Sequence, residues 1–397
     1  MTLPDALIVE RFRSFAERAS LPLRPITLVY GANNSGKSAL LRALALLSAS
    51  LEPAARGSII LPERAFADVQ PRELAWQGAA GDYKWKLGLR WESGNVRELV
   101  ATINPSAEGD VPLAALEVVR DEGALWRARS SDGVLVDPAT GAPVPFEGLI
   151  PAVEATMLAD LRQQLVGLGG RIRWLASVRP SIPRLIGGPV QSRGYVTDGS
   201  EVPHLLVDDR ALREEVAAFY ATLDPPRSLE LHEIPHLGHS FSMNPASQPS
   251  WRVHLRDTGE GMSQALPVLA YAALTAREGG ILAVEEPESH LHPSAQSHLA
   301  SYLCKLARRP AGPRFVIETH SRVVLLAVQR AVAAGLPAEY VQIVWVDQDR
   351  DGRSTVTSIP LHANGRMGDG WPPSALAEDL LLARELIRAS RPPVEGP

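Results

Sequence analysis

The sequence predicts an α/β fold built around a parallel sheet. Two observations support this expectation. Strand-like and helix-like segments alternate from residue 261 onward, as in "GILAVEE", "SAQSHLASYLCKLARR" and "RFVIETH", which is typical of parallel strands joined by crossover helices. Near the start of the chain, "VYGANNSGKSALLRAL" (29–44) places a glycine-rich loop between an apolar strand and an amphipathic helix.

The expected elements divide the chain into four regions. Residues 1–80 form an N-terminal lobe with the strands "ALIVERF" and "ITLVYG" and the helix "GKSALLRALALLSAS". Residues 81–205 begin with short strand-like runs such as "YKWKLGLRW", which predict an antiparallel β insertion, and continue with a helix and the strand "RIRWLASV". Residues 206–338 form a C-terminal lobe. Residues 339–397 predict a small β-hairpin, from "EYVQIVWV" and "RSTVTSIPL", then a last helix and a tail.

Composition narrows the class of protein. The 397 residues carry a net charge of −5, so no overall positive field indicates nucleic-acid binding. The single cysteine, Cys304, excludes an internal disulfide and a multi-cysteine zinc site, and its helix-like surroundings predict a buried, apolar role. Without a signal-peptide pattern or a run of about 18 apolar residues, we expect a cytoplasmic protein with no membrane span. The lack of a sustained heptad pattern argues against long coiled-coil arms.

The segment GANNSGKS fits the phosphate-binding pattern G-x-x-x-x-G-K-[ST]. Its glycines permit backbone angles and close approaches that a Cβ would block. Successive N–H groups and the positive end of the following helix then favour an anion. Lys37 can reach the β- and γ-phosphates, and the Ser38 hydroxyl can bind Mg²⁺. The expected nucleotide contacts are Gly31, Asn33, Asn34, Ser35, Gly36, Lys37, Ser38 and Ala39.

The segment "GILAVEEPESHLHP" is an apolar strand that ends in two carboxylates, Glu285 and Glu286. A strand delivers such acids to the sheet edge where open α/β folds bind ligands. We expect Glu285 to hold Mg²⁺, directly or through water, together with Ser38. Glu286 is placed to orient or deprotonate an attacking water.

The segment "RFVIETHSRV" repeats this arrangement at the end of another strand. Glu318, Thr319 and His320 stand at its last positions, and a helix follows. A histidine at such a place can donate a hydrogen bond to a γ-phosphate oxygen. We therefore count His320 with Glu286 among the catalytic candidates; the competing interpretation is a structural histidine.

A Gly-x-Gly turn opens a long helix in "RDTGEGMSQALPVLAYAAL" (256–274). Such a turn can present N–H groups and the positive end of the helix dipole to an anion. On its own, the pattern is equally typical of an ordinary helix start.

Together these stretches resemble ABC-type ATPases, within the branch that includes the OLD nucleases, RecF and the SMC-like proteins. In that family "VERFRSF", "GANNSGKSALLRAL", "DTGEGMSQALPVL", "VEEPESHLHPSAQ" and "IETHS" correspond to the N-terminal strand, Walker A, signature, Walker B with D-loop, and H-motif. The C-terminal region is similar to that of a subgroup without a Toprim nuclease domain. The resemblance implies an ABC-ATPase-like P-loop NTPase core with a mixed sheet, which binds ATP and Mg²⁺.

The resemblance also implies a homodimer that forms on ATP binding, or a higher oligomer built from it. Each ATP would lie between Walker A of one subunit and the signature of the other. Thr258, Gly259 and Gly261 would then contact the partner's nucleotide. This chain departs from the family's Leu-Ser-Gly-Gly-Gln, so either Thr258 or Ser263 would supply the hydroxyl that meets the γ-phosphate.

Further assignments concern residues outside these motifs. Gln70 in "FADVQPREL" is the best candidate for the family's Q-loop. Arg13 either approaches the nucleotide or is a solvated surface arginine. An arginine-rich stretch either faces the phosphates of DNA or is paired with the chain's 45 acids. Its members are Arg171, Arg173, Arg179, Arg184 and Arg193.

The segment "IVWVDQDRDGRS" suggests a metal site through Asp347, Asp349 and Asp351. A calcium loop would need a glutamate at its twelfth position, where Ser358 stands. A Toprim site would need more chain than the 26 residues between His320 and Asp347. We therefore favour a β-hairpin with a polar Asp-Gly turn over a metal site.

The leading functional hypothesis is an ATP-hydrolysing switch that dimerises on ATP. By family analogy it would act on DNA or on an effector nuclease in bacterial antiphage defence or DNA repair. One alternative is a low-turnover ATP sensor or scaffold for a separate effector, and another is a Toprim-like metal-dependent nuclease. A transporter motor is disfavoured because no membrane span is expected, and a small-molecule kinase because it would need neither His320 nor the signature turn.

Overall fold

A parallel sheet forms the centre of the protein. The computed structural model describes residues 2–52, 59–78, 81–121, 123–131, 134–153, 155–188, 196–248, 250–372 and 385–386. Its central sheet has the order β12 (Val196–Thr197), β11 (Ile172–Leu175), β15 (Ile281–Glu285), β16 (Arg314–Glu318), β3 (Ile26–Gly31), β17 (Val341–Gln348) and β18 (Ser354–Ile359). Neighbouring strands are parallel from β12 to β17, and only β18 is antiparallel. The predicted parallel α/β core is therefore confirmed, as is the predicted C-terminal hairpin.

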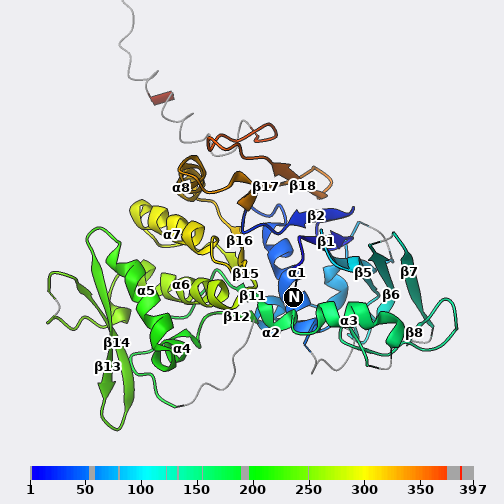
Figure 1. Ribbon diagram of the computed structural model, residues 1–397, viewed down its shortest axis with the longest axis horizontal. Coiled ribbons are helices and arrows are strands. Elements are labelled where there is room, and N and C mark those ends of the chain that lie inside the picture. Colours follow the sequence, from blue (N-terminus) through cyan, green and yellow to red (C-terminus); the bar gives the residue numbers. More distant parts are fainter. Residues whose placement is uncertain are drawn as a thin grey trace, which may run out of the picture.

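A second, antiparallel sheet lies beside the first (Figure 1). Its order is β2 (Ala19–Pro22), β1 (Ala6–Glu10), β4 (Trp85–Arg90), β5 (Val96–Ile103), β6 (Leu113–Arg120), β7 (Leu125–Ser131) and β8 (Val134–Val136). The predicted antiparallel strands are present. They do not stand alone, because β4 pairs along the whole of β1, so the N-terminal strands and the later strands form one sheet.

Helix α1 (Lys37–Ser50) is enclosed between the two sheets. The predicted apolar side, with Leu40, Leu41, Leu44 and Leu47, is fully buried. Ala43 and Ala45 on its other sides are buried as well, because α1 packs against strands of both sheets. A helix enclosed in this way has a fixed position, and so does the loop that precedes it.

Helices cover the opposite face of the parallel sheet (Figure 1). These are α4 (Val202–Asp208), α5 (Arg210–Ala221), α6 (Glu260–Glu278), α7 (Pro293–Leu306) and α8 (Arg322–Ala333). Strand side chains alternate accordingly: Ile281 and Ala283 belong to the core around α1, and Leu282 and Val284 to the core under the helices. Cys304 of α7 is buried, as its sequence context predicts.

The remaining helices and strands stand outside the two seven-stranded sheets. They comprise α2 (Glu63–Phe66), α3 (Ala159–Leu165), the strand pair β9 (Phe146–Glu147) and β10 (Ile150–Pro151), and the hairpin β13 (Arg227–Ile234) with β14 (Gly238–Pro245). The predicted last helix and tail lie outside the described residues, apart from Glu385 and Leu386. Within the described part of the chain, no helix combines the length and apolarity needed to cross a bilayer.

Candidate nucleotide site

The loop between β3 and α1 has positive φ angles at two positions. Gly36, the N-cap of α1, has a φ of 103°, and Asn34 has a φ of 64°. A Cβ at Gly31 would collide with the carbonyl oxygen of Val346 on β17. Glycine is therefore needed at both ends of the loop. The Lys37 ammonium is buried and donates to the carbonyls of Gly31 (3.1 Å) and Ala32 (2.8 Å).

A cavity of about 530 Å³ lies at this loop and brings distant segments together. Its predicted members are Asn33, Asn34, Gly36, Lys37, Ser38, Ala39, Glu286 and His320. Arg13 also lines it, and burial together with the neighbouring Arg42 guanidinium lowers the pKa of Arg13. Gly31 and Ser35 belong to the same loop but do not line the cavity.

Glu318, at the end of β16, is a site residue for which the sequence assigned no role. Its carboxylate accepts a hydrogen bond from the Ser38 hydroxyl at 2.8 Å and lines the cavity. Burial, followed by the negative charge of Glu285, raises the pKa of Glu318 to about 7. The sequence does place Glu318 near His320 at the end of a strand. It does not give the order of the strands, which is what brings Glu318 next to Ser38.

Glu285 does not line the cavity. It is 3% exposed, and its carboxylate accepts hydrogen bonds from Arg42 Nε (3.0 Å) and from the Trp174 indole (3.2 Å). A second Arg42 nitrogen donates to its other oxygen at 3.3 Å. The structure therefore places the acid that the sequence assigned to Mg²⁺ in a network with an arginine and a tryptophan.

Glu286 directs its carboxylate into the cavity from a strained backbone. Its φ is 42°, in the left-handed region that non-glycine residues seldom occupy. Its N–H donates to the carbonyl of Glu318 (2.8 Å), and its carboxylate accepts from the Ser289 hydroxyl (3.0 Å). These bonds hold a conformation of the kind that clusters at functional sites.

His320 is exposed at the edge of the cavity. Partial burial of the ring, followed by the charge of Lys37, lowers the pKa of His320, which favours the neutral imidazole. Its backbone N–H donates to buried Glu288 (3.1 Å), which also accepts from the Thr319 hydroxyl. Glu288 thus ties the segment after β15 to the segment after β16.

Arg179 is a further residue whose place only the structure reveals. It is 4% exposed and donates to the carbonyl of Glu285 (2.7 Å). Its own carbonyl accepts from Gln264 of α6 at 2.9 Å, so it links the signature helix to the end of β15. Burial lowers the pKa of Arg179 to about 10, with the nearby acids, Glu288 first, opposing that shift.

Gln70 does not line the cavity. It caps a short 3₁₀ turn (Pro71–Leu74) in a reciprocal arrangement with Glu73. Gln77, a few residues later, does line the cavity, and its amide donates to the carbonyls of Arg72 (3.1 Å) and Ala75 (3.0 Å). A glutamine from this segment is therefore present at the site, at a different position from the one that the sequence suggested.

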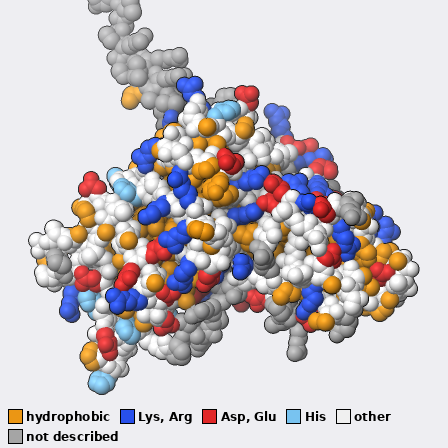
Figure 2. Space-filling view, in the orientation of Figure 1, with side chains coloured by type: hydrophobic (Ala, Val, Ile, Leu, Met, Phe, Trp, Pro, Cys, Tyr) orange, Lys and Arg blue, Asp and Glu red, His pale blue; other side chains and the backbone are white. Residues whose placement is uncertain are grey.

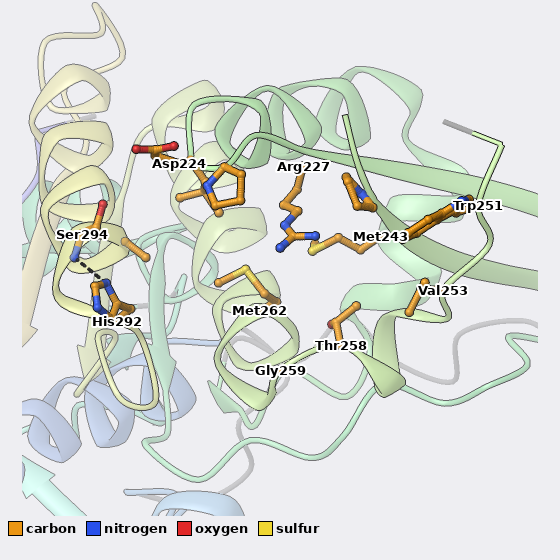
Figure 3. Close-up of a pocket in the computed structure, with 14 residues that line it drawn as sticks. Asp224, Arg227, Met243, Trp251, Val253, Thr258, Gly259, Met262, His292 and Ser294 are labelled. Atoms are coloured by element: carbon orange, nitrogen blue, oxygen red, sulfur yellow. Dashed lines mark hydrogen bonds between the residues drawn. The ribbon is translucent and has the colours of Figure 1, made fainter. Parts of the chain in front are cut away.

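The signature candidates lie at a separate cavity of about 450 Å³ (Figure 3). Thr258 and Gly259 line it, together with Arg227, Met243 and Trp251. Gly261 and Ser263 are buried, and the Ser263 hydroxyl donates within α6, to the carbonyl of Glu260 (2.9 Å). The two cavities share no lining residue, so the signature turn does not complete the nucleotide site of its own chain.

The aspartates near residue 349 belong to the turn of the β17–β18 hairpin. Asp349 accepts hydrogen bonds from the N–H groups of Asp351 (2.9 Å) and Arg353 (2.8 Å), and Asp347 lies on β17 opposite Thr355. Among the described residues, no group of three or more His, Cys, Asp or Glu side chains is arranged to hold a metal ion.

The arginine-rich stretch is not a continuous surface patch. Arg173 and Arg179 are buried, and Arg184 forms an ion pair with Asp257. Arg171 is half-buried, and Arg193 lies outside the described residues. On the face seen in Figure 2, basic and acidic side chains are interspersed. This arrangement favours the interpretation in which these arginines pair with acids of the same chain.

Comparisons with known proteins agree with this fold. Residues 201–327 match the family described as "AAA domain, putative AbiEii toxin, Type IV TA system". The SMC head bound to the C-winged helix domain of ScpA is 14% identical, with a TM-score of 0.54 over 91% of this chain and 99% of that chain. A second SMC head with an extended coiled coil, bound to the C-terminal domain of ScpA from Pyrococcus furiosus, is 13% identical, with a TM-score of 0.51 over 98% of this chain and 100% of that chain. A search of curated proteins gives no match.

The matched segment includes the signature turn, Glu285, Glu286 and His320, but not the loop at 31–38. The structural similarities extend over nearly the whole chain. Their low sequence identities support a shared fold and nothing more specific. The protein therefore has a mixed α/β fold similar to that of SMC heads. Neither kind of match distinguishes the OLD branch from the others.

Proposed function

We propose that this protein is an ATP-binding and ATP-hydrolysing switch whose two copies close head to tail around the nucleotide. The observation that carries the proposal is the convergence of Lys37, Ser38, Glu286 and His320 on one cavity, from three segments far apart in the sequence. A glycine-rich turn with no binding role would not be expected to lie beside acidic side chains and a histidine from the ends of two other strands. ABC-type fold similarity supports the same conclusion independently.

Each residue at the cavity has a role that follows from its position. The loop N–H groups and the positive end of α1 bind the triphosphate, and Lys37 exchanges its two carbonyl partners for phosphate oxygens. The Glu286 carboxylate orients a water molecule for attack on the γ-phosphorus and accepts its proton, while the bond to the bridging oxygen breaks to release ADP. His320 donates to the γ-phosphate. A bound Mg²⁺ ion would neutralise part of the phosphate charge.

The oxygen atoms of Ser38 and Glu318 are suitable ligands for the magnesium ion of a magnesium–nucleotide complex. Mg²⁺ binds through one or two protein oxygens and otherwise through phosphates and waters, so it does not need a cage of several acids. Ser38 supplies a hydroxyl at the foot of α1, and Glu318 beside it has a buried oxygen, Oε2, for which the described residues offer no hydrogen-bond partner. An unpaired buried carboxylate oxygen next to Ser38 is a suitable ligand for a divalent cation.

The separate signature cavity supports the head-to-tail arrangement. Thr258 and Gly259 lie at the start of helix α6 and line a different cavity from the nucleotide site of the same chain. A nucleotide bound at that site would therefore not contact them. Both hydroxyl candidates donate to a nearby carbonyl, Thr258 to Leu255 (2.6 Å) and Ser263 to Glu260 (2.9 Å). Thr258 lines the cavity, whereas Ser263 does not and is 7% exposed. We therefore assign contact with the partner's γ-phosphate to Thr258.

A defence role is proposed on the family description alone, which names a toxin of a toxin–antitoxin system. Opening and closing of the dimer would control an effector protein or nuclease. DNA contact has less support, because the described arginines of the arginine-rich stretch are paired or partly or fully buried.

Sizing the Glu286→Gln variant tests the switch. The substitution should slow hydrolysis while leaving ATP binding intact, so ATP with Mg²⁺ should double the 42.8 kDa mass measured by light scattering. The additional substitution Lys37→Ala is the control and should keep the protein monomeric. A Glu286→Gln protein that binds ATP but stays monomeric would overturn the dimer mechanism, and wild-type turnover equal to that of the variant would favour the ATP sensor.

A further inference from the structure

We propose that Glu318 is the carboxylate of this chain that binds the divalent cation at the nucleotide site, and that Glu285 is a structural anchor. The inference rests on the proposed ATP-binding function and specifies its metal ligand. It departs from the expectation drawn from the sequence, in which Glu285 holds the metal with Ser38.

The strand order gives the first argument. Strand β16 lies between β3, which leads into the phosphate loop, and β15, which carries Glu285. Glu318 is therefore one strand from the loop and Glu285 two, a difference of about 4.8 Å at the usual spacing between strands. The register places both acids at the same level, because Glu285 pairs with Glu318.

The contacts of the two carboxylates give the second argument. Glu318 Oε1 accepts from the Ser38 hydroxyl, the metal-binding group of the loop, and Oε2 is buried without a hydrogen-bond partner among the described residues. The side chain is 4% exposed yet lines the cavity. Burying a carboxylate oxygen without a hydrogen-bond partner costs free energy of folding. A cation bound between Glu318 and Ser38 would offset that cost.

Glu285, by contrast, has no free oxygen. Arg42 donates to both of its oxygens, and Trp174 donates to one of them. Turning Glu285 toward the loop would break these bonds and leave the indole N–H of Trp174 buried without a partner. Arg42 pairs with Glu285, so the acidic side chains that line the cavity are Glu318, Glu286 and Glu73, and of these Glu318 contacts Ser38.

Metal-dependent nucleotide binding distinguishes the two acids. We would measure the affinity of a fluorescent ADP analogue in Mg²⁺ and in EDTA for wild type, Glu318→Gln and Glu285→Gln. The Mg²⁺-dependent gain in affinity should fall at least about tenfold in Glu318→Gln and by less than about twofold in Glu285→Gln. Affinity in EDTA should be the same in all three proteins.

A direct readout uses Mn²⁺ as the probe. Compared with ADP and Mn²⁺ without protein, wild type and Glu285→Gln should further reduce the sharp signal of free Mn²⁺ in the electron paramagnetic resonance spectrum, and Glu318→Gln should reduce it little. Glu318→Asp keeps the charge and should recover part of the binding. Glu117→Gln, at an exposed ion pair with Arg127, controls for the substitution itself. Circular dichroism and thermal unfolding show that each variant is folded.

The outcomes separate this inference from the proposed function. If wild type binds no nucleotide, both fail. If wild type binds nucleotide and Glu318→Gln keeps the full Mg²⁺-dependent gain, the metal assignment fails and the ATP-binding proposal stands. Loss of that gain in Glu285→Gln or Glu286→Gln, with Glu318→Gln unaffected, would also overturn the assignment.

Discussion

At the scale of single residues, surroundings separate side chains that the sequence presents as equivalent. Glu285 and Glu318 both end apolar strands and both precede another polar residue. One is enclosed by Arg42 and Trp174, and the other contacts Ser38 and the cavity. A carboxylate becomes a ligand or an anchor according to the donors that reach it, and those donors come from distant segments.

Arg179 illustrates the same point for a cation. From the sequence, it is one of several arginines expected either to face the phosphates of DNA or to pair with acids. In the fold it is buried, and its guanidinium donates to the carbonyls of Glu285 (2.7 Å) and Glu286 (3.4 Å). It therefore positions the backbone that carries Glu286.

Cys304 provides a prediction at this scale. Burial raises the pKa of its thiol to about 12, and the side chain is 5% exposed. A raised pKa keeps the neutral thiol, so at pH 8 about one thiol in ten thousand is the reactive thiolate. The native protein should therefore fail to react with iodoacetamide at pH 8, and unfolding in guanidinium should expose its single reactive thiol, as measured by mass spectrometry.

The Cys304→Ser variant is the blank for this measurement. Rapid modification of the native protein, at the rate of the unfolded chain, would contradict the buried position of α7. The test thus reports on the packing of the helical layer.

At the scale of elements, the β17–β18 hairpin supports the phosphate loop. The Ser354 hydroxyl, at the start of β18, donates to the carbonyl of Ser35 in the loop at 2.6 Å, and its N–H donates to the carbonyl of Ser14 at 2.8 Å. The carbonyl of Val346 lies directly against Gly31. The hairpin therefore fixes the loop conformation from outside.

Ser354→Ala tests this support. Loss of the bond to Ser35 should lower the free energy of unfolding by about 1 kcal/mol and weaken nucleotide binding up to about fivefold, because the loop loses preorganisation. Ser358→Ala, on the same strand but exposed, is the matched control and should change neither quantity. Equal nucleotide affinities for the two variants would indicate that the hairpin does not shape the loop.

At the scale of the whole molecule, the two cavities are complementary halves of one proposed site. The nucleotide cavity carries the P-loop and the acids, and the signature cavity carries Thr258 and Gly259. In the proposed head-to-tail pair, each half would lie against the other half of its partner, with two-fold symmetry.

Mixing two inactive variants tests this symmetry. A Cβ at Gly259 would meet no atom within 4 Å, so Gly259→Glu should fold normally while placing a carboxylate against the partner's phosphates. Neither Gly259→Glu nor Lys37→Ala should hydrolyse ATP alone. Their mixture should recover turnover, because a mixed pair has one of its two sites intact. With random pairing of subunits, half of the pairs are mixed, which gives at most about a quarter of wild-type turnover.

The mixture of each variant with wild type serves as the control for subunit exchange. Absence of recovery, with exchange demonstrated, would exclude a site shared between two subunits. Activity of Lys37→Ala alone would instead contradict the nucleotide site itself.

The sequence by itself determined the local features of this protein. The glycine positions and the Lys-Ser pair predicted the phosphate loop, because backbone geometry at a loop-to-helix junction depends on residues next to each other. Alternating apolar segments predicted the parallel core, the antiparallel strands and the C-terminal hairpin, since burial on a strand or helix follows the period of that element.

Only the tertiary structure decided which polar groups meet. The order of β3, β16 and β15 places Glu318 nearest Ser38, and the packing of α1 brings Arg42 to Glu285. It also placed Gln77 instead of Gln70 at the cavity, and Arg179 in the interior. These relations join residues far apart in the chain, and the order of strands in a sheet is set by the packing of whole elements, which no local pattern encodes.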